Sequence, residues 1–138
     1  MESSSSLAYV DKYVDEVMRY GQNWGVVLSG IAENEEHVLT NVLACDLYIA
    51  LEDVCKAISY LTIARSLLKV ENEKDRLYVE AWEAWMSGSL DVSYERFCEI
   101  LVKFPDDMLA LKRGQLLAFL SGKAQKMVDI AKIPQVVQ

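Results

Sequence analysis

Residues 74–122 read KDRLYVEAWEAWMSGSLDVSYERFCEILVKFPDDMLALKRGQLLAFLSG, and this stretch decides the fold because it contains one pattern twice. When the sequence is shifted so that Lys74 falls on Met108, identical residues pair at four positions: Leu77 with Leu111, Ala84 with Ala118, Ser87 with Ser121, and Gly88 with Gly122. The same shift pairs large apolar residues at three more: Trp82 with Leu116, Trp85 with Phe119, and Met86 with Leu120. A fixed period of this kind predicts a repeated helical unit.

Several residues of this unit have clear physical roles in a helix–turn–helix. The small Ala84 lets the first helix approach its partner, and Gly88 permits a sharp turn that a side chain would strain. Phe97 fills the space between the two helices, and Pro105 ends the second one. A helix–turn–helix period of about 34 residues, the one found here, is the signature of tetratricopeptide repeats.

Elsewhere, apolar residues recur at steps of three and four, and no stretch alternates as a half-buried strand would. This spacing predicts helices over about 7–20, 35–50, 53–69, 73–87, 91–103, 107–121 and 123–132. The expected helix-capping residues are Ser6, Asn34, Asn72 and Asp106. Gly21 is expected to end the first helix, and Gly25 and Gly30 make 22–32 read as a connection.

The chain is therefore expected to be all-α, with antiparallel helical hairpins stacked as a short tetratricopeptide-like α-α superhelix. We place this helical domain at 7–132, with its best repeat at 74–107 and a partial repeat at 108–132. A polar tail, 1–6, precedes it, and a tail at 133–138 follows because Pro134 cuts the last helix short. An upstream set with the small–large–small spacing of a second helix indicates a degenerate repeat with a longer loop: Ala57, Leu61 and Ala64.

Composition excludes some classes of partner. The net charge of −7 and a pI of about 4.7 argue against binding to phosphate backbones or anionic lipid. The longest uninterrupted aliphatic or aromatic stretches, such as Leu116–Leu120, are far shorter than the roughly 20 residues that a membrane-spanning helix needs. Three unevenly spaced cysteines suggest no disulfide framework, and no secretory signal is visible. We expect a cytoplasmic protein with no membrane insertion.

No pattern in the chain predicts catalysis, a metal site or a cofactor. The single histidine, His37, lacks partners at the spacing of helical metal ligands and is expected to face solvent in a first helical turn. Cys45, Cys55 and Cys98 are expected to behave as small apolar residues rather than as nucleophiles. Glycines are too scattered to cradle a phosphate. We therefore expect no enzyme, and keep an unrecognised active site as the remote alternative.

Three segments also carry a family resemblance: YVDKYVDEVMRYG at 9–21, ENEEHVLTNVLAC at 33–45 and FPDDMLALKRGQLLAFLSGKAQKMVDIAK at 104–132. They resemble the N-terminal part of proteins similar to tetratricopeptide repeat protein 38. That resemblance implies a helical-repeat protein of which this chain corresponds to roughly the first third. Its last residues, 133–138, depart from the helix-rich pattern of the family.

In tetratricopeptide geometry, the first helix of each repeat lines the concave surface where partners bind. The residues expected there are Tyr78, Trp82, Trp85, Lys112, Leu116 and Phe119. Only Lys112 could serve a carboxylate clamp, so the face predicts a groove for an apolar segment of an unidentified protein or peptide. Three alternatives stay open: further helices of a longer protein cover the face, the chain self-associates through it, or the chain is a non-functional truncation.

Overall fold

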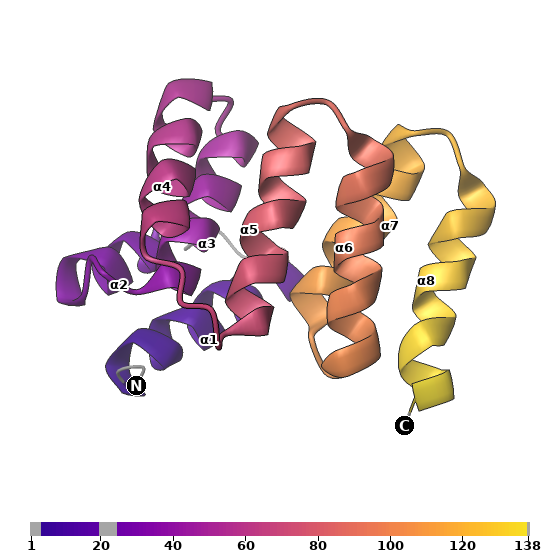
Figure 1. Cartoon of the computed structure of the whole chain (residues 1–138), viewed down its shortest axis with the longest axis horizontal. Coiled ribbons are helices and arrows are strands. Elements are labelled where there is room, and N and C mark those ends of the chain that lie inside the picture. Colours follow the sequence, from indigo (N-terminus) through magenta and orange to yellow (C-terminus); the bar gives the residue numbers. More distant parts are fainter. Residues whose placement is uncertain (1–3, 20–24, 138) are drawn as a thin grey trace.

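The structure, a computed structural model, describes residues 4–19 and 25–137, and this part of the chain contains eight helices and no strand (Figure 1). The helices are α1 Ser4–Met18, α2 Val26–Glu33, α3 Val38–Ala50, α4 Val54–Ser66, α5 Glu73–Met86, α6 Leu90–Lys103, α7 Met108–Leu120 and α8 Ala124–Val137. The all-α fold class is thereby confirmed. None of these helices is long and apolar enough to cross a membrane.

The last six helices form three hairpins that stand side by side: α3 with α4, α5 with α6, and α7 with α8 (Figure 1). The shift that places Leu77 on Leu111 also places α6 on α8 from first residue to last, and the end of α5 on the end of α7. The α3–α4 hairpin follows the same plan at a slightly longer spacing. That longer shift places its buried Ala57, Leu61 and Ala64 on three buried residues of α6: Ser93, Phe97 and Ile100.

The three hairpins turn in the same way. In each, the second residue after the first helix adopts a positive φ: Glu52 at 60°, Gly88 at 84° and Gly122 at 70°. In each, the next amide donates back to a carbonyl in the last turn of that helix. Ser89 N bonds Ala84 O at 2.8 Å, and Lys123 N bonds Ala118 O at 2.9 Å. This is the Schellman pattern, which satisfies carbonyls that a helix end leaves free.

Helix α2 lies where the sequence predicted a connection. Gly30 does not break it but allows it to fit, because a Cβ there would stand 2.8 Å from Tyr9 of α1 and 2.8 Å from Thr40 of α3. Gly25 has helical backbone angles at the start of α2. The buried Val27 anchors α2 against its neighbours. Tertiary packing therefore overrides the low helix propensity of glycine.

Both ends of the helical region extend beyond their predicted limits. Helix α1 begins at Ser4 rather than after Ser6, and α8 runs through Pro134 to Val137 rather than ending at Lys132. Pro134 is buried, so packing against the core holds the helix across the residue that should end it. Gly21 lies outside the described residues.

Three of the four predicted capping residues do not act as the N-caps of their helices. Ser6 lies inside α1, and other residues cap α3 and α7. Asp107, not Asp106, caps α7 by accepting from Ala110 N at 3.1 Å. His37 caps α3 by accepting from Thr40 N at 3.3 Å, while Asn34 binds Glu36 N at 3.1 Å just before it. Asn72 caps α5 as predicted, accepting from Asp75 N at 3.2 Å.

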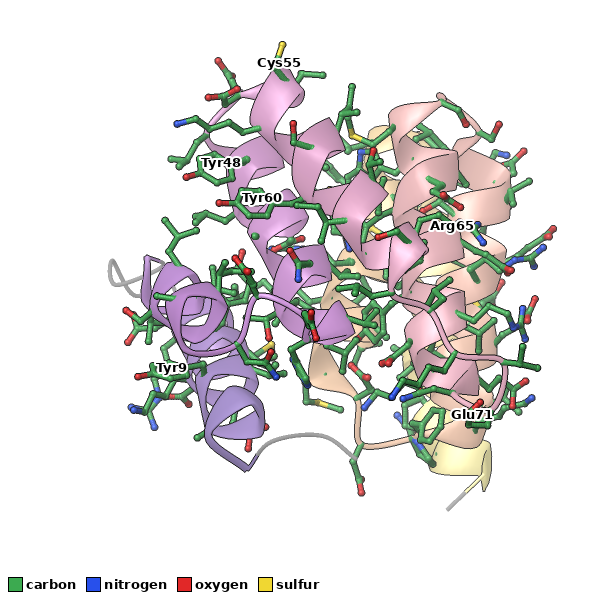
Figure 2. All side chains as sticks on the ribbon, turned by 60° about the vertical axis from the view of Figure 1, so that its left-hand side comes forward. Tyr9, Tyr48, Cys55, Tyr60, Arg65 and Glu71 are labelled. Carbon is green, nitrogen blue, oxygen red and sulfur yellow. The ribbon has the colours of Figure 1, made fainter. Side chains whose placement is uncertain are left out.

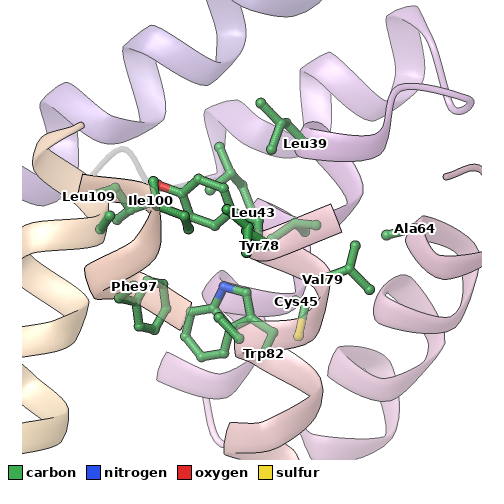
Figure 3. Close-up of a cluster of buried hydrophobic side chains, with 14 of the residues drawn as sticks. Leu39, Leu43, Cys45, Ala64, Tyr78, Val79, Trp82, Phe97, Ile100 and Leu109 are labelled. Atoms are coloured by element: carbon green, nitrogen blue, oxygen red, sulfur yellow. The ribbon is translucent and has the colours of Figure 1, made fainter. Parts of the chain in front are cut away.

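The core is centred on α3 and α5 (Figure 3). Every residue from Val38 to Leu47 is buried, because α3 contacts α1, α2, α4 and α5. Phe97 fills the space between α5 and α6, as predicted, and meets the rings of Tyr78 and Trp82 edge-on at 6.1 Å each. Farther out, Tyr48 and Tyr60 stack at 5.6 Å across the α3–α4 hairpin (Figure 2).

Helix α1 does not continue the row of hairpins. It packs on α2 and α3 and also reaches α7, the first helix of the last hairpin (Figure 1). Lys112 of α7 donates to Val17 O of α1 at 3.2 Å, which joins residues 95 positions apart in the chain. The N-terminal helix thus lies across first helices of the hairpins, on the face predicted to bind a partner.

Candidate binding groove

The six residues predicted to form a binding face do not form one surface. Tyr78 and Trp82 of α5 are core residues, with exposures of 3% and 1%. Trp85 is half-buried and stacks on Trp82 at 4.6 Å. Leu116 and Phe119 of α7 are exposed, Phe119 by 67%. The expectation of a continuous aromatic face is corrected, because Trp82 is enclosed by the core and Tyr78 is almost wholly buried, whereas Leu116 and Phe119 are exposed.

The packing of α5 and α7 explains why the predicted residues are more deeply buried in α5 than in α7. Helix α5 packs on α3, the first helix of the preceding hairpin, as well as on α4 and α6. Helix α7 contacts α6, α8 and α1 but not α5. The sixth predicted residue, Lys112, is half-buried and holds the C-terminal end of α1 through Val17 O. Helix α1 of the chain itself therefore covers part of the face where a partner was expected to bind.

A buried ion pair fixes α1 in this position. Arg113 of α7 donates from Nε and Nη2 to the two carboxylate oxygens of Asp46 in α3, both at 2.7 Å. The hydroxyl of Tyr13 in α1 donates to the same carboxylate at 2.6 Å. Asp46 is 2% exposed and Tyr13 is 1% exposed. Burial, reinforced by the Asp46 carboxylate, raises the pKa of Tyr13 far above its usual value, so the phenol remains the donor.

Beside α1 the surface is hollowed into a groove of about 370 Å³, within the range of about 300–1,000 Å³ typical of binding sites. Its lining comes from α1, α3, α5 and the start of α7: Val10, Asp11, Val14, Asp15, Met18, Leu39, Leu43, Lys74, Tyr78, Asp106, Asp107, Met108 and Leu109. Leu43, Tyr78 and Leu109 come together there from three helices (Figure 3). We call this hollow the α1 groove.

The polar side of the α1 groove is built around Asp107. Its Oδ1 accepts from the Tyr78 hydroxyl at 2.5 Å, and its Oδ2 lies 3.2 Å from the Lys74 ammonium. Burial, together with this carboxylate, raises the pKa of Tyr78 well above its usual value. Asp107 also caps α7, so one carboxylate ties the start of α7 to Tyr78 and Lys74 of α5. Asp11, Asp15 and Asp106 are exposed around the groove.

A second, more polar hollow of about 260 Å³ lies between the α2–α3 and α4–α5 connections, and His37 and Asp75 are among its lining residues. The prediction of a solvent-facing His37 was wrong, because the side chain is only 4% exposed. Its Nδ1 accepts from Thr40 N and pairs with the Thr40 hydroxyl. The ring therefore serves as a helix cap.

The cysteines have different surroundings but no shared site. Cys45 is buried, Cys98 is half-buried and Cys55 is exposed, and all three are free thiols. Burial, and then the neighbouring Asp46 carboxylate, raises the pKa of Cys45 to about 12, so this thiol keeps its proton at neutral pH. Within residues 4–19 and 25–137, no three His, Cys, Asp or Glu side chains are grouped as metal ligands.

The sequence did not predict the Tyr13–Asp46–Arg113 cluster or the α1 groove. One signal was present: Asp46 interrupts the apolar run LACDLYIA at 43–50, and an acid among apolar helical residues indicates a buried, paired carboxylate. Its partners are 33 and 67 residues away, so no local pattern could name them. The groove depends on the position of α1, which helical periodicity does not specify.

Comparisons with protein-family models, with curated proteins and with solved structures find no match for this chain.

Proposed function

We propose that this chain is a non-enzymatic protein–protein interaction module of the tetratricopeptide type. One observation carries the proposal: three successive helical hairpins built on the same plan border an apolar groove beside α1. Helix pairs stacked in this way present extended surfaces that take peptide segments from a partner. The resemblance to proteins similar to tetratricopeptide repeat protein 38 remains a proposal that rests on the residues quoted for it.

The α1 groove replaces the aromatic face as the proposed binding surface. It keeps Tyr78 as part of its wall. The other five predicted residues are not among its lining residues: Trp82, Trp85, Lys112, Leu116 and Phe119. The acidic net charge of −7 supports a protein or peptide partner over nucleic acid. Three free thiols fit a reducing compartment, so we propose a cytoplasmic location.

Site-directed photo-crosslinking tests this function. A photoreactive residue is placed at Met18, which lines the α1 groove and is 38% exposed, and the labelled protein is mixed with a cell extract. The matched control carries the same group at Glu95, which is exposed on α6 and does not line the groove. We expect a discrete crosslinked protein with the Met18 probe alone. Equal labelling from both positions, or none, contradicts the proposal.

A further inference from the structure

The charges around the α1 groove are unbalanced. Four acids, Asp11, Asp15, Asp106 and Asp107, stand against Lys74, which is the only basic residue among the described residues that line it. Lys74 is already engaged, since its ammonium lies 3.2 Å from Asp107 and 5.1 Å from the centre of the Phe104 ring. Asp15 is also paired, with Arg19 at 3.1 Å, and the remaining acids still outnumber the basic groups. The groove therefore has an excess of negative charge at its rim.

The walls beneath that rim are apolar and preformed. Leu39, Leu43, Leu109 and the ring of Tyr78 are at most 7% exposed, so the core holds them in place. Val14 and Met18 of α1 supply the opposite wall, and Met18 remains 38% exposed. An aliphatic side chain inserted here would bury apolar area against surfaces that need no rearrangement.

We propose that the α1 groove binds a short peptide segment in which aliphatic side chains are flanked by lysine or arginine. The aliphatic residues occupy the space between α1 and the Leu43–Leu109 wall, and the flanking cations face Asp11 and Asp106 at the rim. This inference rests on the proposed interaction function and specifies the chemistry of the partner. The net charge of −7 draws a cationic segment toward the molecule and makes its binding sensitive to salt.

Fluorescence anisotropy with three labelled synthetic peptides tests this chemistry on the full chain. The first peptide has a Lys-Leu-Leu-Arg centre, the second replaces both cations by Glu, and the third replaces both leucines by Ser. We expect the first to bind, with an affinity that falls as salt is added, and the other two to bind at least about tenfold more weakly. Equal or tighter binding of the Glu peptide overturns the inference.

Two variants locate the peptide. The double variant Asp11→Asn, Asp106→Asn removes one charge on the α1 side of the groove and one beside the start of α7. We expect it to bind the Lys-Leu-Leu-Arg peptide at least about fivefold more weakly. Val14→Phe enlarges a side chain of the α1 wall and should weaken binding without removing charge. The control, Glu95→Gln with Glu99→Gln, removes two exposed charges from α6 and should leave affinity unchanged. Equal losses in the control and the groove variants contradict the assignment.

The outcomes separate this inference from the proposed function. A protein crosslinked through Met18, combined with no preference for the Lys-Leu-Leu-Arg peptide, leaves the interaction function standing and removes the cationic partner. Crosslinking that fails at Met18, with no binding of any peptide, removes both. Thermal unfolding of each variant, measured alongside, identifies any loss of affinity that comes from loss of the fold.

Discussion

At the scale of single residues, the most consequential group is the buried carboxylate of Asp46. It accepts three hydrogen bonds, two from Arg113 and one from Tyr13, and so ties α1, α3 and α7 together. A buried charge that loses its partner is costly, whereas the intact pair need not stabilise the fold more than apolar residues would. The cluster therefore specifies where α1 lies more than it adds to stability.

Asp46→Ala is expected to lower the free energy of unfolding by about 3–5 kcal/mol, because it leaves the Arg113 guanidinium buried without its partner. Urea denaturation followed by circular dichroism measures the change. Arg65→Ala is the matched control, since its ion pair with Glu83 is half-exposed and should cost less than about 1 kcal/mol. Equal effects would mean that the Asp46 pair is solvated.

The expected loss of stability on truncating Trp82 or Phe119 depends on how deeply each side chain is buried. Trp82→Ala empties a fully buried site and is expected to cost about 3–5 kcal/mol of stability. Phe119→Ala removes a side chain that is 67% exposed, so stability should change by at most about 0.5 kcal/mol. Thermal unfolding of the two variants checks this contrast. A well-folded Trp82→Ala protein would show that the residue does not lie in the core.

The free energy of unfolding is expected to fall at high pH, because two buried tyrosines keep their protons in the folded state. The folded state keeps the phenol protons of Tyr13 and Tyr78 above pH 10, while the unfolded chain loses them near that value. The unfolded state then binds fewer protons, so stability decreases as pH rises, by about 1.4 kcal/mol per pH unit for each group. Tyr13→Phe should remove the contribution of one tyrosine to this slope. Denaturation measured at a series of pH values between 9 and 11 checks the change. An unchanged slope would contradict the burial of its hydroxyl.

At the scale of helices and turns, the three hairpin turns have the same shape but differ in the residue at the positive-φ position. Glycine occupies the positive-φ position in two turns, and Glu52 occupies it in the third. A side chain in this region costs about 1–2 kcal/mol, which glycine avoids. The α3–α4 turn is therefore strained in a way that the other two are not.

Glu52→Gly is expected to raise the free energy of unfolding by about 0.5–1 kcal/mol, and Gly88→Ala to lower it by about 1–2 kcal/mol. In both variants the greater freedom of glycine in the unfolded chain offsets part of the effect on the turn. A Cβ at Gly88 meets no atom within 4 Å, so its cost would come from backbone conformation alone. Chemical denaturation of both variants measures the two signs. Two losses would show that Glu52 is held by its side chain.

The sequence predicted the elements with regular periodicity and missed those that depend on packing. Helices α5 to α7 end within a few residues of their predicted limits, because Asn72, Gly88, Pro105 and Gly122 mark their ends by local chemistry. Helix α2 was missed because Gly30 has a poor helix propensity, and only its contacts with α1 and α3 explain it.

The candidate site was harder to predict than the helices. Assigning Trp82 and Leu116, which are equivalent in the repeat, to one face assumed that equivalent positions have equivalent surroundings. They do not, because α3 and α4 cover α5, whereas α7 is covered by α8 and α1. The contact between α1 and α7 spans most of the chain and leaves no periodic signal in either helix.

At the scale of the whole molecule, α1 connects the first and last parts of the stack. In a linear repeat array each unit contacts only its neighbours, so a change at one end is felt weakly at the other. Here Val17 of α1 is buried and its carbonyl accepts from Lys112 of α7. The described part of the chain should therefore unfold as one cooperative unit.

Val17→Ala tests this cooperativity, because it weakens α1 by about 1–2 kcal/mol and leaves every residue of the last hairpin unchanged. Native-state hydrogen exchange would follow the amides of α3 and α7. We expect protection at Leu117 in α7 to fall by the same free energy as at Leu43 in α3, because both open in the same global event. Val70→Ala, at a fully exposed position, should change neither. If protection falls in α3 and stays constant in α7, α1 closes only the first half of the molecule and the α1 groove must open without disturbing the last hairpin.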